Sequence, residues 1–165
     1  MNGPAPLTVF DGRPLFLVTS EVLGPVRDWP VRGEPFSLLF SSHGSERPAA
    51  EALHELAKDA LAAGAKWAVC TGPWADEMEE AILDAQGEQE QEGEAPGWED
   101  VLVSTVVEGS IAESTWQAWT LFDAGNPPLV AVFLETDPCL EPFKVLARDL
   151  KSTFEGVLEA DSEAD

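Results

Sequence analysis

Short apolar runs alternate with longer amphipathic segments along most of the chain. Residues 13–20 (RPLFLVTS) and 35–42 (PFSLLFSS) are apolar on both faces, which predicts buried strands. Residues 21–34 between them hold two prolines and two glycines and predict a loop. Residues 47–65 then place apolar side chains at helical spacing and predict a helix that ends near Gly64.

The same alternation continues toward the C-terminus. It predicts further strands at 66–72, 98–109 and 127–137, and further helices at 73–85, 110–125 and 141–160. The predicted order is therefore β-β-α-β-α-β-α-β-α. Strands buried on both faces and separated by helices are typical of a mostly parallel sheet with helices on both sides.

We therefore predict a three-layer, Rossmann-like or flavodoxin-like α/β fold with a mostly parallel sheet of about five strands. The first strand is the candidate for an antiparallel edge. The length of 165 residues suits a single domain, which we expect to span residues 1–154. Two acidic, polar segments are expected to lie outside its core, namely a flexible insert at 86–100 and a C-terminal tail at 155–165.

The chain is strongly acidic, with 31 Asp and Glu residues against 9 Lys and Arg residues and a net charge of −22. Half of this charge falls in the insert and the tail. The excess disfavours binding to nucleic acid, whose phosphates are neutralised by Lys and Arg, and to anionic membrane surfaces. It suits solubility, or the attraction of a protein with a basic surface.

The two cysteines, Cys70 and Cys139, are too few and too isolated for a disulfide framework or a zinc site, which favours a reducing compartment. The N-terminal residues do not resemble a signal peptide, and no apolar run approaches the roughly 20 residues that span a bilayer. We expect a cytoplasmic protein of bacterial type.

In folds of this class, ligands bind beyond the carboxyl ends of the strands. The residues that follow the predicted strands are Ser41, Ser42, His43, Cys70, Thr71, Gly72, Glu108, Gly109, Ser110, Glu135, Thr136 and Asp137. Cys70 and His43 are the candidate nucleophile and base, because a thiol beside a helix start has its thiolate favoured. The alternative is that Cys70 packs in the core, with nearby carboxylates raising the pKa of its thiol.

Cofactor and metal motifs give no positive prediction. The chain has neither G-x-G-x-x-G nor G-x-x-x-x-G-K-[ST], so we expect no nucleotide cofactor. Asp137 with Glu108 and Glu135 offers oxygen ligands to a hard cation, but without the spacing of a known loop. We therefore assign no metal site.

The chain has six tryptophans and no tyrosine. Trp67 lies in an apolar strand and is expected in the core, whereas Trp74 at a helix start and Trp116 off the apolar stripe of its helix are expected to be more exposed. Exposed tryptophans among acidic residues suit a protein-binding surface; the alternative is that they are large side chains that close the rim of a small core. The candidate binding residues are Trp74, Asp76, Glu77, Glu108, Trp116 and Asp137.

The segments WAVCTGPWADEMEEAILDA and VLVSTVVEGSIAESTWQAW resemble an uncharacterised family of small bacterial domains over residues 66–120. In that family a strand ending near Cys and Gly-Pro leads to an acidic helix, and a later strand often ends in Trp-His. Here Val106 and Val107 occupy the Trp-His places, so a role of that His does not carry over. The resemblance implies a bacterial origin and an α/β fold, and no activity.

Two functions follow as hypotheses. The first is a non-enzymatic protein-binding or regulatory domain, immunity-like or accessory, that binds a basic protein through its acidic surface and exposed tryptophans. The alternative is a small cysteine-dependent hydrolase or transferase with Cys70 and His43 at the carboxyl ends of the strands. The position of the Cys70 thiol relative to His43 separates the two.

Overall fold

The computed structural model describes residues 6–21, 29–31, 33–43, 48–91, 102–106, 110–121 and 127–163. The strands are β1 (Thr8–Phe10), β2 (Arg13–Ser20), β3 (Phe36–Ser41), β4 (Ala65–Thr71), β5 (Leu102–Val106) and β6 (Leu129–Leu134). The helices are α1 (Ala50–Ala63), α2 (Ala75–Gln91), α3 (Ile111–Thr120), α4 (Leu140–Ala147) and α5 (Leu150–Glu163).

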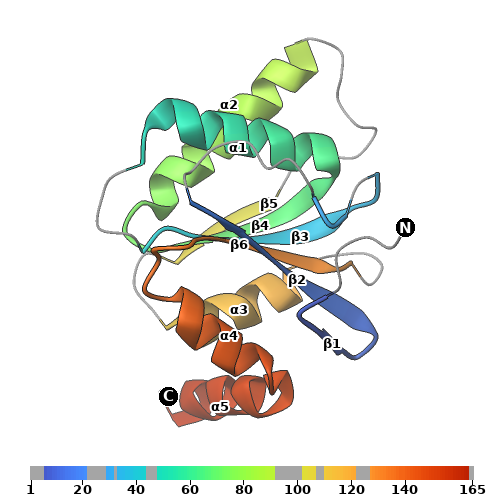
Figure 1. The fold of residues 1–165 in the computed structure, drawn as a ribbon, viewed down its shortest axis with the longest axis vertical. Coiled ribbons are helices and arrows are strands. Elements are labelled where there is room, and N and C mark those ends of the chain that lie inside the picture. The colour runs from blue at the N-terminus through green and yellow to red at the C-terminus, as the bar shows by residue number, and fades with distance from the viewer. Residues whose placement is uncertain are drawn as a thin grey trace.

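The described strands form one six-stranded sheet in the order β1-β2-β6-β3-β4-β5 (Figure 1). All neighbouring strands are parallel except β1 and β2. The last strand in the sequence, β6, thus lies in the middle of the sheet between β2 and β3. This order is neither that of the classic Rossmann fold nor that of flavodoxin, although the layers are the same.

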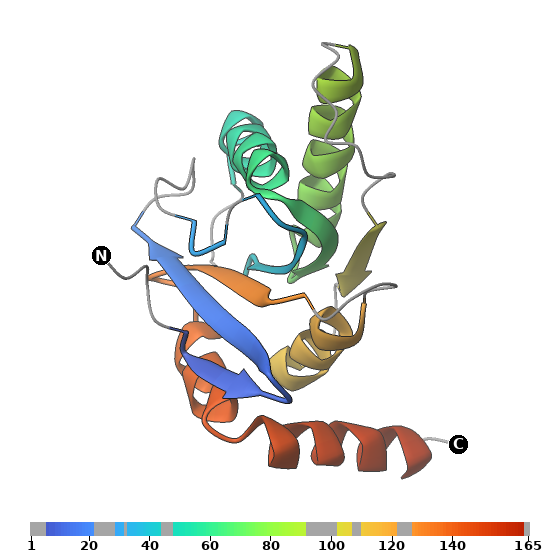
Figure 2. The same cartoon turned by 90° about the vertical axis from the view of Figure 1, so that its right-hand side faces the viewer.

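Helices cover both faces of the sheet. Helices α1 and α2 lie side by side on one face, and α3, α4 and α5 lie on the other, with α5 furthest from the sheet (Figures 1 and 2). In β3, Leu38 and Phe40 pack in the core under α1 and α2, whereas Leu39 packs in the opposite core. Burial on both faces explains the uninterrupted apolar runs, and the predicted three-layer α/β fold is confirmed.

The antiparallel edge is a different strand from the one predicted. Arg13–Ser20 pairs in parallel with β6, and the antiparallel edge is β1, which the apolar pattern did not predict. With β1 added to the five predicted strands, the sheet has six described strands. Asp11 and Gly12 make the turn between β1 and β2 with φ angles of 53° and 75°, as in the type I′ turns that join tight hairpins.

Two helices end later than predicted. Helix α2 continues past Ala85 to Gln91, because the first part of the expected insert is rich in Glu and Gln, which are good helix formers. The rest of the insert, residues 92–100, lies outside the described residues. Helix α5 likewise continues through the expected start of the tail at Glu155 as far as Glu163.

The predicted last helix is divided into α4 and α5 by a turn at Arg148 and Asp149. The Asp149 Oδ1 accepts a hydrogen bond from the Ser152 backbone N at 3.2 Å. A carboxylate that binds a free N–H in the first turn starts a new helix, and it explains the division.

Candidate functional site

The carboxyl ends of β3 and β6 meet at the point where the chain leaves the sheet in opposite directions. Strand β3 leads to α1 on one face, and β6 leads to α4 on the other (Figure 1). Such a switch point is where open α/β sheets bind their ligands. His43 follows β3, and Asp137 and Cys139 follow β6, so three chemically active side chains converge there.

We call His43, Asp137 and Cys139 the rim cluster. One imidazole nitrogen, one carboxylate oxygen and the Cys139 sulfur all lie within 4.8 Å of one another. Asp137 is only 5% exposed, whereas His43 and Cys139 are half-buried. The cluster therefore combines a buried anion with two side chains that solvent still reaches.

Three hydrogen bonds hold the Asp137 carboxylate in place. The Ser41 hydroxyl donates to Oδ2 at 2.7 Å, the His43 backbone N donates to Oδ2 at 3.2 Å, and the Cys139 backbone N donates to Oδ1 at 2.8 Å. Asp137 thereby ties the end of β3 to the turn before α4. His43 and Asp137 were both predicted as residues that follow a strand, and the structure brings them together.

The hydroxyl of Ser41 also determines which ring nitrogen of neutral His43 carries the proton. It lies 2.9 Å from His43 Nδ1, and its only proton is donated to Asp137. The hydroxyl oxygen must then accept the Nδ1 proton, because a serine side chain has a single O–H. His43 in its neutral form therefore carries its lone pair on Nε2.

Cys139 was not among the predicted site residues, because it lies in the turn beyond the strand end and not at the end itself. Burial, and then the charge of Asp137, raise the pKa of its thiol. The thiol therefore stays protonated at neutral pH, which does not favour the nucleophilic thiolate that a cysteine-dependent enzyme needs.

Cys70, the candidate nucleophile, is a core residue. Its side chain is 0% exposed and packs beneath α1 and α2 with Phe40, Met78 and Ile82. Burial, followed by the charges of Glu79 and Asp76, raises the pKa of the Cys70 thiol. A thiol in this position does not reach the rim, so the packing alternative describes Cys70.

The raised pKa of Cys70 predicts a stability that falls at alkaline pH. The native state holds the thiol proton more tightly than the unfolded state, so the stabilisation is complete below about pH 8.5, the ordinary thiol pKa. It should then be lost at roughly 1.4 kcal/mol per pH unit as the pH rises toward the folded pKa. Urea unfolding of the reduced protein and of Cys70→Ala, from about pH 8 to pH 10, measures this difference.

In this comparison Cys139→Ala is the control, and it should keep most of the alkaline loss. The free energies of unfolding of wild type and Cys70→Ala should converge as the pH rises. Parallel curves would show that the buried thiol ionises as easily in the folded protein as in the unfolded one.

The turn between β4 and α2 is tightly packed and hydrogen-bonded. Gly72 has a φ of 107°, and a Cβ atom at this position would lie 2.8 Å from the Ser42 hydroxyl oxygen and 2.9 Å from the Ser42 backbone. The Ser42 hydroxyl accepts a hydrogen bond from the Trp74 backbone N, and it donates to the Thr71 carbonyl at 2.9 Å. The sequence Cys-Thr-Gly-Pro-Trp therefore joins a strand to a helix without leaving an open site.

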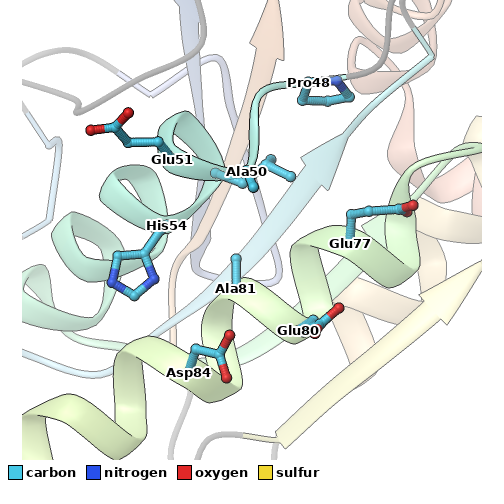
Figure 3. A pocket seen from close by; sticks show the side chains of 9 residues that line it. Pro48, Ala50, Glu51, His54, Glu77, Glu80, Ala81 and Asp84 are labelled. Carbon is cyan, nitrogen blue, oxygen red and sulfur yellow. The ribbon is translucent and has the colours of Figure 1, made fainter.

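A second candidate site is a cavity of about 480 Å³ between α1 and α2 (Figure 3). We call it the α1–α2 groove. On α1 its lining includes Glu51 and His54, and on α2 it includes Glu77, Glu80 and Asp84. Spacings of three and four residues place these side chains on the helix faces that meet. The groove is separate from the rim cluster, none of whose residues line it.

The groove is acidic on both sides. Helix α2 contains no basic residue and carries Asp76, Glu77, Glu79, Glu80, Asp84, Glu88 and Glu90. Nearby, Glu88 pairs with His54 at 2.9 Å and with Lys58 at 4.0 Å. Within the described part of the chain, the side-chain carboxylates of Glu51, Glu80 and Asp84 have no hydrogen-bond or ion-pair partner.

Trp74 and Trp116 are too buried to form the exposed protein-binding surface that was predicted. Trp67 is 3% exposed, and Trp74 is the more exposed of the two, as predicted, although it is half-buried. Trp116 is also half-buried, and its ring centroid lies 5.0 Å from that of Phe154 on α5. Trp74 and Trp116 therefore help to close the core, and neither side chain is an exposed anchor.

The remaining predicted binding residues are dispersed. Asp76 is exposed at the start of α2, Glu77 lines the α1–α2 groove, and Asp137 belongs to the rim cluster. Glu135 is exposed in the turn after β6, whereas Glu108 lies outside the described residues. The structure thus divides the predicted site into two places on the molecule.

Two further findings bear on the class of protein. Every helix in the described part of the chain is too short or too polar to cross a bilayer. Comparison with known proteins gave no matching family model and no matching curated protein.

Proposed function

We propose that the protein is a non-enzymatic binding domain that receives a Lys- or Arg-rich segment of a partner protein in the α1–α2 groove. The observation that carries this proposal is the juxtaposition of acidic side chains from two helices around one cavity. A volume of this size accommodates a few side chains of a partner.

Charge complementarity supports a basic occupant. Acidic side chains three or four residues apart on one helix repel each other, and each such pair costs a few tenths of a kcal/mol. Ammonium or guanidinium groups between Glu51, Glu80 and Asp84 would replace this repulsion with attraction. The overall charge of −22 would in addition steer a basic partner toward the protein.

The same proposal disfavours nucleic acid as the ligand, and we propose that the protein is cytoplasmic. Phosphates would meet like charges at the groove. Two cysteines without a disulfide are compatible with a reducing compartment. An immunity-like or accessory protein would have these properties.

Neutralising the groove should weaken binding of a basic probe about tenfold. The variant Glu51→Gln/Glu80→Gln/Asp84→Asn removes three exposed charges, each contributing about 0.5 kcal/mol, and 1.4 kcal/mol corresponds to a factor of ten. A fluorescein-labelled oligolysine peptide, followed by fluorescence anisotropy, measures the affinity. Its association rate should also fall steeply between about 50 and 500 mM salt, because the Debye length shrinks.

The matched control is Glu141→Gln/Glu155→Gln/Glu159→Gln, which removes the same charge from exposed positions on α4 and α5, across the sheet from the groove. This variant should bind the peptide nearly as well as the wild type. An equal loss in both variants would mean that the probe senses only net charge, and the groove would then have no specific role. A partner recovered from the host should show the same difference between the two variants.

The alternative function, a cysteine-dependent hydrolase or transferase, has weaker support. Its proposed nucleophile, Cys70, is buried in the core. The thiol beside His43 is that of Cys139, whose raised pKa opposes thiolate formation. We therefore favour the binding function.

A further inference from the structure

We propose that the rim cluster of His43, Asp137 and Cys139 binds a divalent transition-metal ion of the zinc class. Each residue offers one donor atom, and the three donors converge at the switch point of the sheet. Nothing in this assignment depends on the α1–α2 groove, which lies elsewhere on the molecule.

The set of donor atoms determines the class of ion. Nitrogen, oxygen and thiolate sulfur together are the ligands of Zn²⁺ and similar borderline ions, whereas Mg²⁺ and Ca²⁺ take oxygen ligands. Binding converts the Cys139 thiol into a metal thiolate and releases one proton to solvent. Three protein ligands leave a fourth position open to water or to a ligand group.

The surroundings of His43 match those of a metal ligand. Histidine ligands usually donate the second ring N–H to a neighbouring acceptor, which fixes the orientation of the ring. Here Nδ1 lies 2.9 Å from the Ser41 hydroxyl, which in turn donates to Asp137, so this contact fixes the orientation of the ring beside the carboxylate. The same serine thus supports two of the three proposed ligands.

The buried carboxylate supports a cation at this place. Asp137 is 5% exposed, and among the described residues it has hydrogen-bond donors but no Lys or Arg partner. A buried anion normally requires a counter-charge or a metal ion. A divalent ion would supply that charge, and the carboxylate oxygens keep lone pairs for it beside their hydrogen bonds.

The three donor atoms need to move only a short distance to reach the spacing of a metal site. Metal–ligand bonds of about 2.0–2.3 Å in a tetrahedron place the donor atoms roughly 3.3–3.8 Å apart. The donors now lie within 4.8 Å of one another. His43 and Cys139 are half-buried and lie in the segments that follow β3 and β6, so a movement of about one ångström brings them into bonding range.

Titration of the reduced, chelator-treated full-length protein with Co²⁺ tests the proposal. One Co²⁺ per chain should produce a near-ultraviolet thiolate-to-cobalt charge-transfer band and visible bands of tetrahedral intensity, and Zn²⁺ should abolish both. Cys139→Ser should lose the charge-transfer band, and His43→Ala should weaken binding at least about tenfold. Cys70→Ala, the matched control, should keep the band.

Other outcomes would overturn the assignment. Weak binding without a charge-transfer band would show adventitious carboxylate sites on an acidic protein. A band that survives in Cys139→Ser, or that disappears in Cys70→Ala, would place the thiolate elsewhere. Unchanged affinity in His43→Ala would remove the imidazole from the site, and circular dichroism of each variant confirms that the fold is intact.

Discussion

Replacing Trp67 by alanine should lower the free energy of unfolding by about 3–5 kcal/mol, the usual cost of emptying a large aromatic site. Trp67 is 3% exposed in β4 and lies two residues before Val69, which packs in the core on the α3 side of the sheet, so the two side chains share that face. Small domains are stable by only about 5–15 kcal/mol, so this single change would remove a large share. Urea unfolding at neutral pH measures the loss.

Val145→Ala on α4 is the control for this measurement, because Val145 is a large apolar residue that is 61% exposed. Its effect should stay within about 0.5 kcal/mol, as is usual for surface positions. A loss below about 1 kcal/mol in Trp67→Ala would mean that the indole ring is not enclosed by the core.

Replacing Arg13 by methionine should destabilise the protein by about 2–4 kcal/mol. Arg13 is buried at the start of β2, where its guanidinium lies 4.2 Å above the Trp119 ring and donates hydrogen bonds to the carbonyls of Trp119 and Pro127. Each hydrogen bond from a charged donor contributes about 1.5–3 kcal/mol, while loss of the buried charge returns part of this through solvation.

The burial of Arg13 lowers the pKa of its guanidinium to about 10, so the side chain remains charged at neutral pH. Methionine has a similar volume but no donors, and it leaves both carbonyls without this partner. Arg148→Met at the exposed end of α4 is the matched control and should change stability by less than about 0.5 kcal/mol. If both variants were equally stable, the two hydrogen bonds of Arg13 would contribute nothing net.

Most strands and helices were predictable because each is encoded by its own local pattern. Residues 13–20 were assigned to β2 with its observed bounds, since the apolar run at its centre, residues 15–18, packs alternately against the two cores. Strand β1 was missed because three residues carry too little periodicity. The Asp11-Gly12 pair was a stronger signal, since this dipeptide between two apolar runs is characteristic of a hairpin.

The order of the strands was not predictable from local pattern. Strand β6 pairs with β2 and β3, whose residues lie far away in the sequence, and no periodicity reports such a contact. Without this order, the position of His43 opposite Asp137 stays hidden. The residues that follow each strand could therefore be predicted, but which of them lie close together in the fold could not.

The local pattern left two interpretations of Cys70 open and gave no reason to consider Cys139. Cys70 lies near the end of a strand and just before a helix, which is why it was a candidate nucleophile. Its position on the pleated strand directs the thiol into the core beneath α1 and α2. Cys139 lies in a turn whose shape depends on the hydrogen bonds of Asp137. Its proximity to His43 arises only when β6 is inserted beside β3.

The central position of β6 also governs the order in which the chain can complete its structure during synthesis. Strands β3, β4 and β5 are adjacent in both sequence and sheet, so they can pair as they leave the ribosome. Strand β2 has only β1 beside it until Leu129–Leu134 emerges. A nascent chain that stops before β6 exposes the unpaired edges of two apolar strands, β2 and β3, which are surfaces that chaperones protect from aggregation.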